Sequence, residues 1–139
     1  MSQNNIYKIP GNLECEYKFV VGEEHTAKHI GSGTVEVLST PSMIAFMEQA
    51  SLQCVQKHLP KGYTTVGTRV DVKHLKPAPK GAEILIKTKL IEKENRRLVF
   101  KVVALWNNIV IGEGYHERFI VDEAKFMEKL HSLIKSQGA

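Results

Sequence analysis

Apolar and polar residues follow two different periods along the chain, one typical of strands and one of helices. Between residues 63 and 75 the period is two, which predicts a long strand with one face turned toward a core. Between residues 40 and 58 the apolar positions recur at helical spacing instead. By these patterns, strands are expected at residues 13–21, 63–75, 83–92, 97–106 and 109–121.

One long helix is predicted over residues 40–58. Pro41 suits its first turn because the missing N–H would be unpaired there in any case, and Thr40 or Ser39 can cap that end. Residues 43–55 are apolar almost all round. This pattern predicts a helix that is buried rather than half-exposed.

The connections between these elements carry turn residues. Residues 22–33 are rich in glycine and predict an irregular connection, and residues 76–81 contain two prolines, which predict a turn. A short surface helix is expected over residues 122–135. Further turns are expected at residues 94–95 and 107–108. One apolar helix wrapped by an antiparallel sheet is the α+β layout of the hotdog fold, and residues 1–139 are expected to form one such domain.

The composition is that of an ordinary globular domain, with 42% hydrophobic and 24% charged residues. The longest apolar stretch is only five residues, 43–47, whereas a membrane span needs about 20. We therefore expect no membrane span. Residues 1–11 lack the charged start and apolar core of a secretory signal, so a cytoplasmic location is expected.

The chain has two cysteines, Cys15 and Cys54. Cys54 lies within the apolar helix pattern, where a reduced core thiol is the usual occupant, so a disulfide is not expected. Neither cysteine belongs to a CxxC motif and no HExxH motif is present. We expect no metal and no resident cofactor.

The net charge of +4 is modest, but many basic residues fall between Arg69 and Lys101. They indicate either an anionic partner or a solvated face of strands, and the solvated face is the commoner case. Nucleic acid would require interleaved aromatic residues, which this stretch lacks, so no nucleic-acid partner is expected. The phosphates of a small molecule would suffice to explain the charge.

Glu48 is an unusual residue for its position on the predicted helix. The polar stripe of that helix consists of Gln49, Gln53 and Gln56, and Glu48 lies about 100° away from it. Its neighbours one turn away are Ile44, Ala45, Ser51 and Leu52. A carboxylate among apolar residues is costly unless it is paired, and such groups are common at catalytic sites. The pattern alone leaves two readings open, a functional carboxylate and a structural one tied to an arginine.

His74 is a candidate partner for Glu48 on the strand that follows. Strand alternation puts His74 on the same face as Val66 and Val70, with Gly67 on the opposite face. A single histidine there is more often a hydrogen-bonded core residue. On the last predicted strand one face carries Gly112, Gly114, His116 and Arg118, and an ion pair with Glu117 or Glu113 is the alternative for Arg118.

These residues occur in an order and spacing that resembles a known family. The matching segments lie between about residues 34 and 126 and comprise Ser39-Thr40-Pro41, Phe46-Met47-Glu48, Thr65-Val66-Gly67-Thr68, residues 70–74, residues 77–81, residues 95–98, and Ile111-Gly112-Glu113-Gly114 with His116-Glu117-Arg118. Together they resemble the fluoroacetyl-CoA thioesterase-like family of hotdog-fold thioesterases. The resemblance implies an enzyme that hydrolyses an acyl-CoA-type thioester to a free acid and a thiol.

The resemblance also implies roles for individual residues. The Thr, Glu and His triad of the family carries over to Thr40, Glu48 and His74. A carboxylate such as Glu48 can attack a thioester carbonyl or activate a water, and His74 can protonate the departing thiolate. Gly67 would present its backbone to the developing oxyanion, and Arg118 would border the acyl pocket.

The resemblance has further consequences for substrate and assembly. Fluoroacetyl-specific members carry phenylalanines in a lid ahead of the Thr, whereas residues 31–38 contain no aromatic residue, so fluoroacetyl selectivity is not expected. Hotdog domains form homodimers or dimers of dimers with the active site at the subunit interface. By analogy Lys76 and Lys80 would hold the CoA phosphates, although a solvated turn also explains each lysine.

Several alternatives stay open at this point. The chain can instead be a non-catalytic binding module for acyl-CoA or another small molecule, or a hydratase acting on an enoyl thioester. The sequence does not distinguish CoA from a carrier protein as the thiol, or Glu48 as nucleophile from Glu48 as general base.

Overall fold

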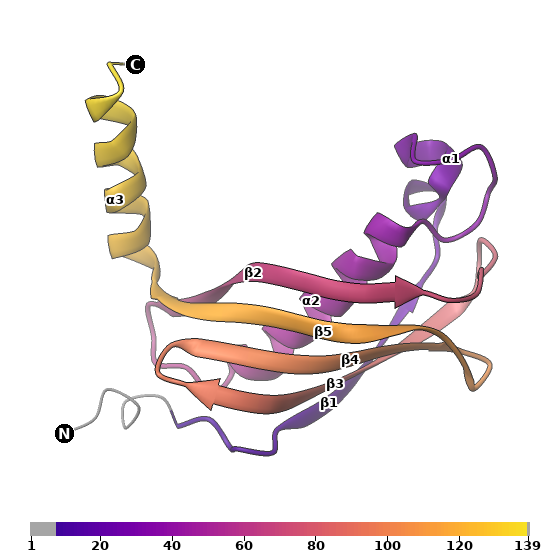
Figure 1. Cartoon of the computed structure of the whole chain (residues 1–139), viewed down its shortest axis with the longest axis horizontal. Helices are drawn as coiled ribbons and strands as arrows, with labels where there is room; N and C mark the ends of the chain where they lie inside the picture. The colour runs from indigo at the N-terminus through magenta and orange to yellow at the C-terminus, as the bar shows by residue number, and fades with distance from the viewer. Residues whose placement is uncertain (1–7, 139) are drawn as a thin grey trace.

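The computed structural model, which describes residues 8–138, shows a five-stranded antiparallel sheet curved around one long helix (Figure 1). The elements in chain order are β1 (Glu14–Val20), the 3₁₀ turn η2 (Glu23–His25), α1 (Ala27–Ile30), α2 (Thr40–Gln56), β2 (Tyr63–His74), β3 (Glu83–Glu94), β4 (Arg97–Trp106), β5 (Ile109–Asp122) and α3 (Glu123–Ser136). Each predicted strand and helix is present, so the expected α+β layout is confirmed.

The strands are ordered β1-β3-β4-β5-β2 across the sheet. Tight turns join β3 to β4 and β4 to β5, and Asn107 and Asn108 have φ values of 51° and 63°, as a two-residue hairpin turn requires. β2 and β3 are not neighbours, because β2 pairs with β5 on the far side. The proline segment predicted as a simple turn is therefore a crossover at the end of the sheet. Within the described residues, β1 and β2 are the two edges.

Helix α2 packs one face against the sheet. Its N-cap is Ser39, whose Oγ accepts a hydrogen bond from the backbone N–H of Ser42 at 3.1 Å. The face toward the sheet buries its apolar side chains completely or nearly so, including Met43, Phe46, Met47, Ala50 and Val55. Each large side chain in such a core contributes about 1.5–3 kcal/mol to folding. The sheet supplies Ile84, Ile86, Leu90, Leu98, Phe100, Val102, Ile111 and Ile120.

The opposite side of α2 is half-exposed, and it includes Ile44, Ala45, Glu48 and Leu52. The prediction of a helix buried all round is therefore wrong for the single chain. The reason is geometric: one curved sheet covers only the side of the helix that faces it. An apolar stripe that keeps partial contact with solvent is a feature of surfaces that bind partners.

Cys15 of β1 and Cys54 of α2 form a disulfide with a Cα–Cα distance of 5.9 Å. The prediction of reduced thiols is thus wrong, because the fold brings together two residues that lie 39 positions apart. The bond ties an edge strand to the central helix. Disulfides are uncommon in the reducing cytosol, so this bond gives no support to the cytoplasmic location, which stays a prediction.

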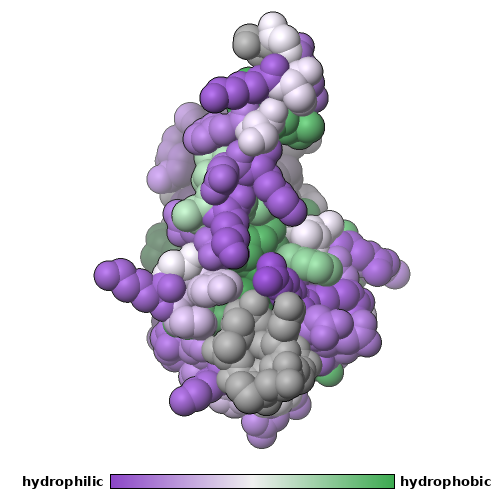
Figure 2. Space-filling view, turned by 90° about the vertical axis from the view of Figure 1, so that its left-hand side faces the viewer, coloured by the Kyte–Doolittle hydropathy of each residue, from purple (hydrophilic) through white to green (hydrophobic). Residues whose placement is uncertain are grey.

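Helix α3 projects from the end of β5 away from the sheet (Figure 1). Asp122 caps it by accepting a hydrogen bond from the backbone N–H of Lys125 at 3.1 Å. In Figure 2 the helix rises above the body of the molecule, and none of its residues is buried. The surface helix expected at this end of the chain is confirmed. Along residues 8–138, every helix is too short or too polar to cross a bilayer.

Candidate active site

Thr40 and His74 meet at the N-terminal end of α2. Because Ser39 caps the helix, the hydroxyl of Thr40 is free for another partner, and it forms a hydrogen bond with Nδ1 of His74 at 2.8 Å. His74 is the last residue of β2, 34 positions further along the chain. The structure thus brings together two of the three residues of the predicted triad.

His74 has the properties of a proton-transfer group. Burial lowers the pKa of His74 below its ordinary value, so the ring is neutral near pH 7. Within the described residues its Nε2 is buried and has no hydrogen-bond partner. A hollow of about 230 Å³ lies here, lined by Val37, Leu38, Thr40, His74, Leu75, Lys76 and Pro77. A neutral imidazole can donate or accept a proton at Nε2, depending on which nitrogen bonds Thr40.

Glu48 lies in a second, separate hollow. It is eight residues beyond Thr40 on the same helix, which corresponds to about 12 Å along the helix axis. This hollow has a volume of about 260 Å³ and is lined by Ala45, Glu48, Gln49, Leu52 and Arg118. A single chain therefore does not bring Glu48 to the Thr40–His74 pair.

Gly67 faces Glu48 because of an irregularity in β2. A β-bulge between Gly67 and Arg69 inserts Thr68, so Gly67 pairs with Arg118 and both face α2. The prediction that Gly67 lies on the face opposite His74 is wrong, since simple alternation ignores the bulge. For the same reason Val66, which was expected to face the helix, pairs with the outward residue Phe119.

Gly67 leaves room for three polar side chains. A Cβ at this position would lie 2.8 Å from Oε2 of Glu48, 3.2 Å from Cε1 of His116 and 3.4 Å from Nη1 of Arg118. Only glycine allows these groups to approach the strand so closely. The carboxylate, the imidazole and the guanidinium therefore converge on one point of the β2 backbone.

Arg118 is buried, with 5% of its surface exposed, and its guanidinium is bonded on three sides. Nε donates to Oγ1 of Thr65 at 2.7 Å, Nη2 donates to the carbonyl of Thr65 at 2.9 Å, and Nη1 lies 3.1 Å from Nε2 of His116. No ion pair involves Arg118 among residues 8–138. The alternative of an ion pair with Glu117 or Glu113 is thus wrong. Burial lowers the pKa of Arg118, and the charge of Glu48 opposes that shift.

The two predicted CoA-binding lysines differ in placement. Lys76 lines the hollow beside Thr40 and His74. Lys80 instead donates to Oε2 of Glu23 at 2.7 Å and is absent from the lining of that hollow. The structure therefore places Lys76, and not Lys80, at the candidate site.

The segment of residues 31–38 lies ahead of α2 and overlaps the glycine-rich stretch that was expected to be an irregular connection. Its second half is held by backbone hydrogen bonds, from Ala27 N–H to the Val37 carbonyl at 2.9 Å and from Leu38 N–H to the Ala78 carbonyl at 2.8 Å. Leu38 is buried, and Val35 is exposed. Val37 and Leu38, at the end of this segment, thus line the Thr40–His74 hollow.

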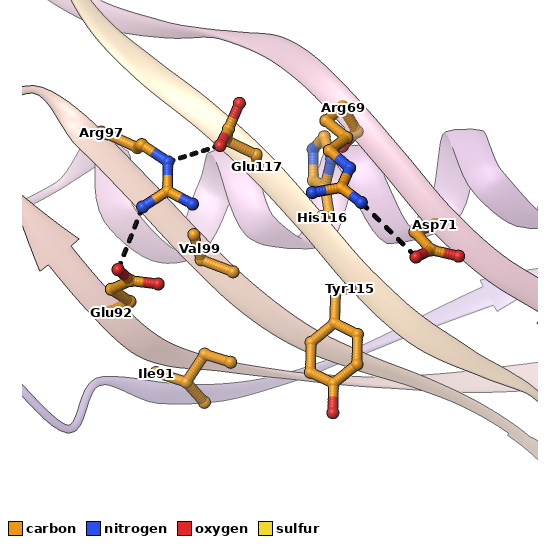
Figure 3. A pocket seen from close by; sticks show the side chains of 9 residues that line it. All are labelled: Arg69, Asp71, Ile91, Glu92, Arg97, Val99, Tyr115, His116 and Glu117. Carbon is orange, nitrogen blue, oxygen red and sulfur yellow. Dashed lines mark hydrogen bonds and ion pairs between the residues drawn. The ribbon is translucent and has the colours of Figure 1, made fainter.

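A third hollow, of about 290 Å³, lies on the outer face of the sheet (Figure 3). Its charged groups pair with one another: Arg97 Nη1 lies 3.1 Å from Glu92 Oε1, and Arg97 Nε donates to Glu117 Oε1 at 2.5 Å. Arg69 and Asp71 form a further ion pair at 3.7 Å. The charged side chains of this hollow are thus paired with one another, whereas the guanidinium of Arg118 on the face toward α2 forms no ion pair among residues 8–138.

Sequence reasoning left Thr65 and His116 out of its site. Thr65 belongs to one of the segments that resemble the family, but it was given no role, because a threonine in a strand pattern is ordinary. His116 was placed on the correct face with Arg118, but its contacts depend on the backbone of Arg69 across the sheet. Only the strand register shows that contact.

Comparisons with known proteins show the family to which the chain is similar. Residues 21–124 match the family described as fluoroacetyl-CoA-specific thioesterase. The chain is 30% identical to the fluoroacetyl-CoA thioesterase of Streptantibioticus cattleyicolor over 120 residues, which cover 82% of this chain and 86% of the relative. A solved structure of the fluoroacetyl-CoA thioesterase FlK superimposes with a TM-score of 0.84 at 28% identity, covering 89% of this chain and 96% of FlK. A thioesterase superfamily member from Thermus thermophilus also has a TM-score of 0.84, at 26% identity, with coverage of 94% and 96%.

Proposed function

The chain belongs to the fluoroacetyl-CoA-specific thioesterase family of hotdog proteins, and from that membership we propose that it hydrolyses an acyl-CoA thioester to a free acid and CoA. The observation that carries the proposal is the 2.8 Å hydrogen bond between Thr40 and His74. It joins two residues, distant in the sequence, that the resemblance names as parts of one triad. Relatives of known structure include a complex of an FlK variant with fluoroacetate and CoA.

The proposed reaction uses Glu48 and His74 on opposite sides of the thioester. The carboxylate of Glu48 attacks the carbonyl carbon, or takes a proton from a water that does so. Where Glu48 itself attacks, the C–S bond breaks to leave an acyl anhydride on Glu48, which a water then hydrolyses to the free acid. By either route the departing thiolate is hydrogen-bonded by Nε2–H of His74 and takes up the proton that the water releases. Arg118 and the backbone at Gly67 lie where the oxygen of the acyl group would gain negative charge.

We propose a broader acyl specificity than that of the fluoroacetyl-specific relatives. Val37 and Leu38 line the site, and residues 31–38 contain no phenylalanine or other aromatic side chain. An aromatic lid that closes over a fluoromethyl group is therefore absent from this segment. Other small acyl groups should be accepted at comparable rates.

The site requires a second copy of the chain in this proposal. Glu48 lies about 12 Å along α2 from Thr40, so one chain cannot complete the triad. In Figure 1, α2 runs obliquely behind the sheet and its N-terminal end passes beyond the edge strand β2. Val70 on that edge is 38% exposed, and the stripe of Ile44, Ala45 and Leu52 is half-exposed.

A two-fold axis at the β2 edge would satisfy these features together. Two β2 strands related by such an axis run antiparallel, and so do the two α2 helices. The Thr40 end of each helix then approaches the later part of the other helix, which carries Glu48. We therefore propose a homodimer with two composite sites, each with Thr40 and His74 from one chain and Glu48 from its partner.

The test of activity is thiol release from a panel of acyl-CoAs by the wild type and by Glu48→Gln. We expect turnover of at least one acyl-CoA and a loss of about 10²–10⁴-fold in the variant, as for removal of a general acid–base or nucleophilic group. The charge control is the double variant Glu48→Gln with Gln49→Glu. It restores a carboxylate to the helix, but at the exposed neighbouring position and therefore at the wrong angle. An inactive wild type, or an active Glu48→Gln, would refute the proposal.

The test of a composite site is complementation between two inactive variants. Glu48→Ala and His74→Ala are purified separately, mixed, and allowed to exchange subunits. A heterodimer then contains one intact site, so the mixture should regain roughly a quarter of the wild-type rate. If exchange is verified by mass and no activity returns, Glu48 and His74 act within one chain.

A further inference from the structure

His116 is buried more completely than any other titratable residue near the candidate site, yet the proposed reaction gives it no task. Only 1% of its surface is exposed. It lies on β5 between the outward residues Tyr115 and Glu117, and its ring points toward α2. Both ring nitrogens have partners, at 2.9 Å and 3.1 Å.

The partners of His116 determine its tautomer. Nη1 of Arg118 can only donate a hydrogen bond, so Nε2 of His116 must accept it through its lone pair. The proton of the neutral ring therefore lies on Nδ1, which donates to the backbone carbonyl of Arg69 at 2.9 Å. Burial lowers the pKa of His116, which favours this neutral form. A bulged segment of β2 thus orients the ring, and the ring orients the arginine.

The bond from His116 completes the restraint of Arg118. Thr65 accepts from Nε and from Nη2, and His116 accepts from Nη1, so each of the three guanidinium nitrogens has one fixed partner. Of the five N–H groups of an arginine, two are then left over. Nη1 and Oε2 of Glu48 both lie near the point that a Cβ of Gly67 would occupy, at 3.4 Å and 2.8 Å.

We propose that His116 is a positioning residue for the hydrolysis: its Nε2 lone pair holds the guanidinium of Arg118 so that the two remaining N–H groups face the site of Glu48 and the acyl oxygen. The inference rests on the proposed function, because it assigns a role within that reaction. It adds a residue that touches no substrate and acts through Arg118. A buried hydrogen-bonded chain of this kind supplies the rigid support that an active-site group needs.

The first experiment measures the tautomer without any substrate. Nitrogen-15 NMR of the imidazole distinguishes protonated from unprotonated ring nitrogens, and we expect protonated Nδ1 and unprotonated Nε2 in His116 at pH 7. The Nε–H of Arg118 should exchange slowly with water. A His116 ring that is protonated at Nε2 would overturn the proposal whether or not the enzyme is active.

The second experiment compares two conservative variants. His116→Gln can place an acceptor near the position of Nε2, whereas His116→Asn reproduces only the Nδ1 side of the ring. We expect His116→Asn to lower kcat about 10- to 100-fold with KM changed less than about twofold, because a misplaced group affects the reaction more than binding. His116→Gln should retain most of kcat, and the outer-face control Glu117→Gln should match the wild type.

Two outcomes separate the failure of this inference from that of the proposed function. If the wild type releases no thiol from any acyl-CoA, the proposed function fails, and the role of His116 in it fails too. If the wild type is active but both His116 variants lose activity equally and in proportion to their loss of thermal stability, His116 is only structural. Rescue by glutamine together with the expected tautomer would support the positioning role.

Discussion

The two faces of strand β5 both carry ionisable residues, but they place these residues in different surroundings. On the outer face Glu117 accepts hydrogen bonds from Thr68 at 2.8 Å and from Arg97 at 2.5 Å. On the inner face the side chains of His116 and Arg118, its immediate neighbours, are buried and form hydrogen bonds to each other and to β2. Three consecutive residues therefore experience two different environments, because successive side chains of a strand alternate in direction.

The difference between the two faces lies in whether a charged side chain is already neutralised by an ion pair. The bonds from Thr68 and Arg97 lower the pKa of Glu117 and leave it permanently ionised at neutral pH. On the inner face, the guanidinium of Arg118 has no carboxylate at ion-pair distance in the described part of the chain. Unneutralised buried groups are typical of functional sites, whereas mutually paired surface groups are typical of ordinary sheet surfaces.

The largest effect on activity should come from replacing the arginine on the inner face, with the arginine on the outer face replaced as the comparison. Arg118→Gln removes the buried cation beside Glu48, and we expect kcat/KM for thioester hydrolysis to fall about 100-fold. Arg97→Gln removes the outer cation and should leave kcat/KM unchanged. Comparable losses of activity in both variants would show that the inner and outer faces do not differ in function.

A smaller effect is expected from Gly67→Ala. The added methyl group would meet Oε2 of Glu48 at 2.8 Å and Cε1 of His116 at 3.2 Å, so both side chains must shift. We expect about a tenfold loss of kcat with little change in the melting temperature. Thr68→Ala, one residue further on the outer side of the bulge, is the matched control, with activity near the wild type. An active Gly67→Ala would place the reaction away from this point.

The smallest effect is a dependence of stability on pH. Burial lowers the pKa of both His74 and His116, so the unfolded chain binds protons more readily than the folded chain. The stabilisation is present above pH 6.5 and declines as the pH falls below that value, with a limit of about 1.4 kcal/mol per pH unit for each group. Glu117 contributes only near and below pH 4.5, since its pKa is lowered from there.

Denaturant unfolding at pH 7.5 and pH 5.5 measures this dependence. The free energy of unfolding should be lower at pH 5.5, and the difference should shrink in His116→Gln, which cannot titrate there. An unchanged difference in that variant would mean that His116 is protonated equally in both states. The outer-face variant Glu117→Gln should show the wild-type difference at these two pH values.

The amino-acid sequence alone predicted the five strands and the two longer helices, whereas η2 and α1 lie where an irregular connection was expected. The strand period, the turn asparagines and the proline at the start of α2 are local signals, and all led to elements that the structure contains. The family resemblance pointed to Thr40, Glu48 and His74. Local signals succeed here because hydrophobic periodicity and turn chemistry depend on neighbours in sequence.

Tertiary structure decided how those residues are grouped. The bulge at Thr68 turns Gly67 toward the helix, the disulfide joins Cys15 to Cys54, and the β2–β5 register places Thr65 against Arg118. A simple alternation rule misses the effect of the bulge, because one inserted residue reverses every face that follows it. The disulfide and the strand register depend on segments that are distant in the sequence. The distance between Glu48 and the Thr40–His74 pair likewise follows from the rise of one rigid helix. Spacing in sequence identified the residues, but only packing between distant segments shows which of them can meet within one chain.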